Sequence, residues 1–145
     1  MENDSSSKVQ VTYLGTNSLV FQKGRTALMI DPHFTRPGFC RLLGRLRPDP
    51  ESVARGLHQA GITALDAVLL THTHYDHAMD VAEVAKRTDA LLVGSESTAN
   101  IGRGGGLPED QIKIVEDGES LTFGNFTVTM IDSKHFVFPE SSTLA

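Results

Sequence analysis

Four consecutive apolar residues, Ala67-Val68-Leu69-Leu70, constrain the fold more than any other part of this chain. An apolar run this short is typical of a strand buried on both faces, so other layers must cover its sheet on each side. A second such run follows at residues 91–93, and apolar residues at helical spacing predict a helix at 78–87 between them. Strands therefore alternate with helices here, which predicts an α/β fold.

The flanking segments add further expected elements. Alternating apolar residues predict strands at residues 9–14, 18–21, 26–30, 112–115, 120–123 and 126–131. Helices are expected at residues 50–60 and 95–101; the first has Asp49 as N-cap, Pro50 at its first position and Gly61 as its stop. Strands precede and follow the alternating part, which predicts a mixed sheet. Residues 1–7 are polar and expected to be disordered, leaving 8–145 as one domain.

Charge and cysteine content exclude several classes of protein. The formal net charge is −5, which argues against a nucleic-acid partner. The one basic stretch, residues 36–47, is interpreted as a solvated helix face. Cys40 is the only cysteine, so neither an intramolecular disulfide nor a thiolate metal cluster can form. Neither a signal-peptide pattern nor an apolar run of membrane-spanning length is present, so a cytoplasmic location without a membrane partner is expected.

Residues 71–77, THTHYDH, follow the apolar run directly and contain three of the six histidines. If the strand continues through His72 and His74, both side chains leave the same side of the backbone and can converge on one ion. Asp76 and His77 follow where the chain turns into a helix, which suits a second ion nearby. Four potential ligands in six positions at a strand end favour a metal site over structural histidines. Imidazole and carboxylate without cysteine favour zinc, and also accept manganese or iron.

A first ion needs a ligand besides His72 and His74. His58 lies on the expected helix and should face solvent, and His33 follows a strand but has no partner in the sequence. His135 stands just past the expected strand 126–131, and we therefore choose it as the third ligand.

The motif His72-Thr-His74-Tyr-Asp76-His77 resembles HxHxDH, the signature of the metallo-β-lactamase fold superfamily of metal-dependent hydrolases. The opening, VTYLGTNSLVFQKGRTALMIDP, resembles the first hairpins of that superfamily, closest in style to the branch with ascorbate-phosphate lactonases and related phosphodiesterases. This resemblance covers most of residues 8–135. It implies that the chain is the first half of an αββα sandwich.

The resemblance also implies a binuclear site. His72, His74 and His135 would hold the first ion, and Asp76 and His77 would belong to the second. Asp31 would orient a ligand imidazole from behind. A metal-bound hydroxide would then attack an ester, lactone or phosphodiester bond of a small-molecule substrate, with Asp76 as the essential carboxylate.

This chain departs from the superfamily after His135, where no aspartate or histidine follows, although members usually supply a bridging aspartate and a final histidine there. Two alternatives therefore stay open: a metal-binding module without turnover, and a nucleic-acid-processing hydrolase on the same fold. The inner sheet face, with Val11, Leu19 and Val128, is expected to be apolar and uncovered. We therefore expect the chain to self-associate or to pair with a missing second half.

Overall fold

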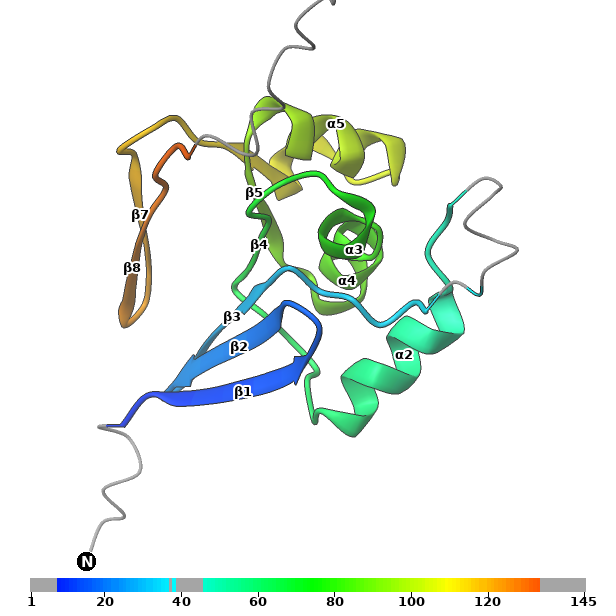
Figure 1. Cartoon of the computed structure of the whole chain (residues 1–145). Coiled ribbons are helices and arrows are strands. Elements are labelled where there is room, and N and C mark those ends of the chain that lie inside the picture. Colours follow the sequence, from blue (N-terminus) through cyan, green and yellow to red (C-terminus); the bar gives the residue numbers. More distant parts are fainter. Residues whose placement is uncertain (1–7, 37, 39–45, 134–145) are drawn as a thin grey trace, which may run out of the picture.

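The computed structural model describes residues 8–36, 38 and 46–133. A six-stranded mixed sheet forms its centre, and a separate two-stranded hairpin lies beside it (Figure 1). The strands of the large sheet, in spatial order, are β1 (Gln10–Gly15), β2 (Ser18–Lys23), β3 (Thr26–Ile30), β4 (Ala67–Leu69), β5 (Leu91–Gly94) and β6 (Ile112–Ile114). Pairing is antiparallel from β1 to β3 and parallel from β3 to β6, so the predicted mixed α/β fold is confirmed.

The remaining elements connect or cover these strands. The hairpin consists of β7 (Ser120–Phe123) and β8 (Phe126–Thr129). The helices are α2 (Pro50–Gln59), α3 (Tyr75–Ala78), α4 (Val81–Thr88), α5 (Glu96–Gly104) and the 3-10 turn η2 (Glu109–Gln111). The 3-10 turn was not predicted. No helix among the described residues is long and apolar enough to cross a membrane. The predicted tail at 1–7, most of the basic stretch, and His135 lie outside the described residues.

Helix α2 begins and ends where the sequence predicted. The Asp49 side chain accepts a hydrogen bond from the backbone N–H of Glu51, and Pro50 occupies the first helical position. Gly61 follows the helix with φ of 66°, a left-handed conformation that glycine adopts without steric cost. Val53 and Leu57 are buried, whereas His58 is exposed, as the helical spacing predicted.

Two boundaries around residues 71–77 differ from the prediction. Strand β4 ends at Leu69, because the Thr71 backbone N–H donates to the Asp31 carboxylate (2.8 Å) instead of to a neighbouring strand. The helix predicted for 78–87 begins earlier, at Tyr75, and is divided into α3 and α4. Asp80 stands between the two helices, and its fully buried carboxylate accepts the backbone N–H groups of Phe34 (2.6 Å) and Thr35 (2.7 Å).

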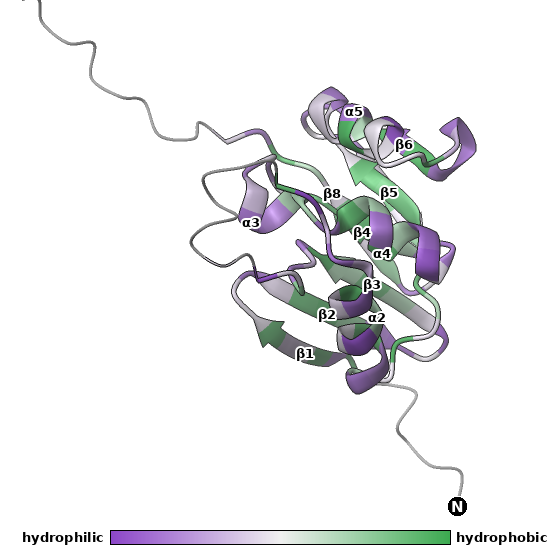
Figure 2. Ribbon diagram, turned by 90° about the vertical axis from the view of Figure 1, so that its right-hand side faces the viewer, coloured by the Kyte–Doolittle hydropathy of each residue, from purple (hydrophilic) through white to green (hydrophobic). Residues whose placement is uncertain are grey.

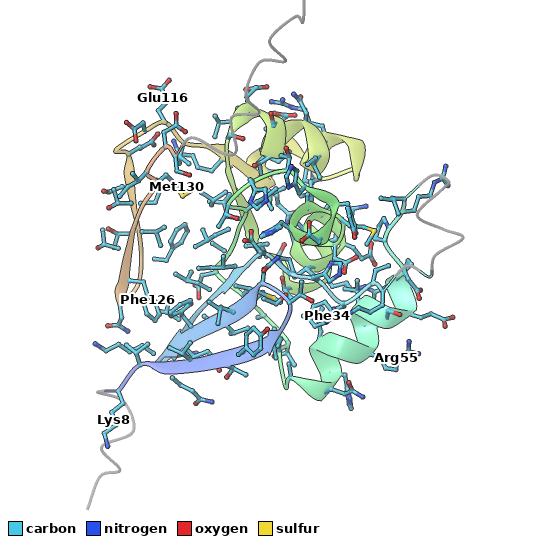
Figure 3. The ribbon with its side chains drawn as sticks, viewed as in Figure 1. Lys8, Phe34, Arg55, Glu116, Phe126 and Met130 are labelled. Carbon is cyan, nitrogen blue, oxygen red and sulfur yellow. The ribbon has the colours of Figure 1, made fainter. Side chains whose placement is uncertain are left out.

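The helices pack on one face of the sheet and the hairpin packs on the other (Figure 1). On the helical face, Met29, Val68 and Leu92 of the central strands are buried against apolar residues of α2 and α4. Figure 2 shows the strands as mainly hydrophobic, whereas α2 carries hydrophilic residues on its outer side. Phe34 packs over α2 at Gly56, where a Cβ atom would lie 2.1 Å from the phenylalanine ring (Figure 3).

The hairpin covers only part of the inner sheet face. Phe126 and Val128 of β8, and Met130 directly after it, pack against a cluster that contains Leu28, Leu69 and Val93. Figure 3 labels Phe126 and Met130 on this side of the sheet. The prediction that Val128 is uncovered is therefore wrong, because β7 and β8 fold back over the central strands.

Strands β1 and β2 carry the part of this face that the hairpin leaves open. Val11 pairs with Phe21, and Phe21 pairs with Leu28 of the hairpin-side cluster, so these three side chains share one face. Val11 is 53% exposed, as predicted, and the neighbouring Tyr13 is 65% exposed. Leu19, opposite Tyr13, is half-buried. An apolar strip therefore remains open to solvent along β1.

Candidate metal centre

The three histidines of residues 71–77 form one cluster beyond the carboxyl end of β4. The ring centroids of His72 and His74 are 4.8 Å apart, with the rings nearly perpendicular. The ring of His77, from the first turn of α3, lies 3.8 Å from that of His72. The strand does not continue through His72 and His74, so the loop and the start of α3 bring the rings together rather than strand alternation.

Asp31 supports this cluster from the end of β3. Its φ of 46° lies in the left-handed region, which aspartate tolerates better than most residues. The fully buried Ser18 hydroxyl holds this turn, because it donates to the Asp31 carbonyl (2.8 Å) and accepts the His33 backbone N–H (2.8 Å). The turn directs the Asp31 carboxylate at Thr71 and at His77.

Hydrogen bonds to Asp31 determine which nitrogen of each ring carries hydrogen. A carboxylate oxygen accepts, so His77 donates from Nδ1 to Asp31 Oδ2 at 2.7 Å. The Thr71 hydroxyl also donates to Asp31 Oδ2 (2.6 Å), and its oxygen then accepts from His72 Nδ1 at 3.1 Å. In both rings the lone pair is therefore left on Nε2, as in histidines that bind metal through that nitrogen.

Asp76 and His77 lie at a distance that suits ligands of one ion. Asp76 Oδ2 is 3.7 Å from His77 Nε2. Two ligand atoms at about 2.1 Å from a tetrahedral ion are roughly 3.4 Å apart. The donor set and its separation therefore fit a divalent cation, with a carboxylate oxygen and an imidazole nitrogen as ligands.

Asn17, from the turn between β1 and β2, lies against the same pair. Its Nδ2 is 2.7 Å from His77 Nε2 and 3.5 Å from Asp76 Oδ2. Because Nδ1 of His77 carries the hydrogen, the Asn17 amide donates to the Nε2 lone pair.

His33, which follows β3, is buried close to Asp76 and His77. Its Nδ1 has no hydrogen-bond partner within the described part of the chain. Burial lowers the pKa of His33 below its usual value of 6.5, and the neighbouring Arg36 guanidinium lowers it further. Both effects favour the neutral form of the ring, while Asp80 anchors the following backbone at Phe34 and Thr35.

A cavity of about 190 Å³ opens next to the histidine cluster. His72 lines it from one side, and residues after β8 line it from the other, ending with Ser133, the last described residue. The chain therefore returns to the cluster two positions before His135. The carboxylate-bearing residues Glu116, Asp117 and Asp132 also line this cavity.

The described residues bring together two residues of each predicted ligand set, but no more. Within residues 8–36, 38 and 46–133, no three His, Cys, Asp or Glu side chains converge in a way that can hold an ion. His72 and His74 are neighbours, as are Asp76 and His77, with Asp31 behind His77. The metal-binding roles of these residues and of His135 stay predictions.

Sequence reasoning missed three residues of this centre: Asn17, Ser18 and Thr71. Nothing in a single sequence links Asn17 to a histidine 60 positions later. Thr71 had a local signal, since it directly precedes His72 at the end of a buried strand.

Comparison with known proteins places these features in a family. Residues 11–139 match the family model of the Metallo-beta-lactamase superfamily. A UPF0173 metal-dependent hydrolase of Agrobacterium fabrum is 27% identical over 128 residues, covering 88% of this chain and 48% of that protein. A UPF0173 metal-dependent hydrolase of an Anaeromyxobacter species is 30% identical over 132 residues, covering 88% of this chain and 43% of that protein. The chain thus spans about half the length of the curated relatives it matches.

The fold is also found among solved structures. The subclass B3 metallo-beta-lactamase BJP-1 of Bradyrhizobium japonicum aligns with a TM-score of 0.56 and 22% sequence identity. The alignment covers 82% of this chain and 47% of that structure. This likeness concerns the fold alone.

Proposed function

This chain belongs to the metallo-beta-lactamase superfamily. We propose that it functions as a metal-dependent hydrolase, which cleaves an ester, lactone or phosphodiester bond of a small-molecule substrate. The curated relatives from two bacteria, both named metal-dependent hydrolases, support a hydrolytic role. The kind of bond rests on the resemblance of the opening strands and the HxHxDH motif. A nucleic-acid substrate fits less well with the net charge of −5.

One observation carries this proposal: Asp31 directs hydrogen onto Nδ1 of both His77 and, through Thr71, His72. Two histidines with only a structural role do not require that both rings carry hydrogen on Nδ1 and the lone pair on Nε2. Carboxylate-supported imidazoles are a recurrent feature of metal sites, where the supporting group fixes the ring and raises its basicity.

The proposed ligands are His72, His74 and His135 for a first ion, and Asp76 and His77 for a second. The position of Ser133 beside His72 in one cavity supports the choice of His135. Zinc fits this nitrogen and oxygen donor set, as do manganese and iron. A bound ion would supply a Lewis acid and lower the pKa of a water molecule.

The chain's own residues would position the ion and its substrate. Asp31 keeps the hydrogen on His77 Nδ1, and Thr71 does the same for His72. The adjacent cavity has space for a small substrate next to His72. Asp76 supplies the one carboxylate among the predicted ligands, with Oδ2 3.7 Å from His77 Nε2, which makes it our candidate for the essential acidic residue.

Further parts of the proposal concern partners and location. The apolar strip at Val11 and Tyr13 suits a covering layer, supplied by a second half of the fold or by another copy of the chain. A cytoplasmic location is consistent with Cys40 being the only cysteine.

The proposal can be tested by measuring metal content and hydrolysis together. The chain would be loaded with zinc or manganese and assayed with generic ester, lactone and phosphodiester substrates. We expect turnover that chelation abolishes and metal restores. Full activity after exhaustive chelation would exclude the mechanism.

A second candidate is a metal-binding module without turnover. It is favoured by the fact that the chain spans about half the length of the curated relatives it matches. Tight binding of metal without hydrolysis of any substrate class would select this alternative.

A further inference from the structure

The amide of Asn17 occupies the direction in which His77 can bind a metal. Its Nδ2 lies 2.7 Å from His77 Nε2, the nitrogen that Asp31 leaves with the lone pair. We propose that Asn17 is a plug that must leave this lone pair before a second ion binds, and that it thereby lowers the affinity for that ion. This inference rests on the assignment of Asp76 and His77 to a second ion.

The Asn17 amide and a metal ion cannot both occupy the lone pair of His77 Nε2. An imidazole nitrogen has one lone pair in the ring plane, so an N–H donor and a metal ion approach it along the same direction. An ion would lie at about 2.0–2.1 Å along that direction. The amide nitrogen at 2.7 Å would then be within about 1 Å of the ion, far closer than two non-bonded atoms can approach.

The chemistry of the amide explains why it fits this position. The carboxamide nitrogen carries two hydrogens with partial positive charge. One is donated to the lone pair of His77, and the nitrogen is also 3.5 Å from Asp76 Oδ2. The amide thus satisfies in part the two groups that a cation would satisfy, without carrying a net charge itself.

The backbone on both sides of Asn17 is anchored, so release requires rotation of its side chain rather than movement of the loop. On one side, the Thr16 carbonyl accepts the Tyr13 hydroxyl, and the Thr16 hydroxyl accepts the Arg36 guanidinium. On the other side, Ser18 is fully buried and bonded to the Asp31 carbonyl. Hydrogen bonds on both sides of Asn17 therefore hold the turn that places its amide against His77.

Titration of the metal-free chain with zinc, followed by calorimetry, tests the proposal. We expect the wild type to bind a first ion tightly and a second more weakly. In Asn17→Ala the second step should become about fivefold tighter, which corresponds to removal of one competing hydrogen bond, while the first step is unchanged. Asn100→Ala is the matched control, because Asn100 lies on α5 and bonds only to Arg103 among the described hydrogen bonds.

Each outcome decides between the hypotheses. A second step that is unchanged or weaker in Asn17→Ala, or absent from both proteins, would overturn the plug. Absence of any zinc binding in the wild type would instead overturn the proposed function, and the plug with it. If Asn17→Ala folds poorly, Asn17→Ser replaces it in the titration. The shorter serine side chain cannot reach His77 Nε2, so we expect the same tighter second step. The ¹⁵N chemical shift of His77 Nε2 in metal-free protein gives a second readout, which must change when the amide is removed.

Discussion

The carboxylate of Asp31 lies 2.7 Å from Nδ1 of His77, although 46 positions separate the two residues. This contact joins the end of β3 to the first turn of α3. It connects the antiparallel part of the sheet with the loop that follows the first parallel pair. The orientation of a predicted metal ligand therefore depends on a strand that contributes no predicted ligand of its own.

Replacement of Asp31 by asparagine tests this dependence. The new amide would place an N–H group opposite His77 Nδ1, or leave the Thr71 N–H without its acceptor after a flip. We expect metal affinity to fall by about 10- to 100-fold, as is typical when a group behind a ligand is lost. Competition with a chelator measures the change. Asp66→Asn is the control, since Asp66 accepts the Ala27 N–H away from the cluster and should leave affinity unchanged.

Replacement of Asp76 by alanine should separate activity from stability. Asp76 is partly exposed, and among the described residues its side chain makes one long hydrogen bond to Asn17 (3.5 Å) and approaches His77 (3.7 Å). We therefore expect the urea midpoint to stay within error while turnover falls by about two orders of magnitude or more. Unchanged turnover would remove Asp76 from the mechanism.

Replacement of Ser18 by alanine should destabilise the fold. The hydroxyl is fully buried and bridges the Asp31 carbonyl and the His33 N–H, both of which would lose their partner. The free energy of unfolding should fall by about 1–3 kcal/mol, measured by urea denaturation. Ser120→Ala is the comparison, because its hydroxyl pairs with Thr129 at the surface and should change stability by less than about 0.5 kcal/mol.

The buried ring of His33 predicts a pH dependence of stability. Its pKa is lowered in the folded state, first by burial and then by Arg36, so the unfolded chain binds its proton more readily. The contribution of His33 to the free energy of unfolding is therefore complete above pH 6.5. It is lost as the pH falls from 6.5 through the lowered pKa. Urea denaturation at several pH values should show that the free energy of unfolding depends less steeply on pH in His33→Gln than in the wild type. The exposed His58 provides the control variant His58→Gln, which should retain the wild-type slope.

The open apolar strip on β1 predicts association. Val11 and Tyr13 expose 53% and 65% of their surface on the face that the hairpin covers elsewhere. Sedimentation at micromolar concentration should show self-association that weakens in Val11→Thr and Tyr13→Ser. Ile131→Thr, which removes an exposed side chain outside this strip, should not weaken it. A compact monomer whose sedimentation coefficient does not change with concentration would contradict this prediction and show that the strip stays exposed to solvent.

Local signals in the sequence predicted most of the elements, because their causes lie within a few residues. Asp49, Pro50 and Gly61 define α2 through capping and backbone conformation. The boundary of β4 was wrong because a distant side chain sets it: the Asp31 carboxylate accepts the Thr71 N–H, 40 positions away in the sequence. The covering of Val128 was not predicted, since alternation shows which residues share a face but not what covers that face.

The candidate site divides in a similar way. Spacing within residues 71–77 identified the histidine cluster, and the described geometry places His72, His74 and His77 together. The plugging contact of Asn17 depends on the register of β1 and β2 and on the turn between them. Such a contact becomes visible only when the strands are placed in space.

The Ser18 hydroxyl bridge has a consequence for the order of events during synthesis. Ser18, Asp31, Thr71 and His77 all precede α4, and the contacts among them need nothing from β5 onward. Chains emerge from the ribosome N-terminus first. The residues that orient the imidazole of His77 are thus all translated before the hairpin that covers part of the inner face, whereas His135, the proposed third ligand of the first ion, is translated after it.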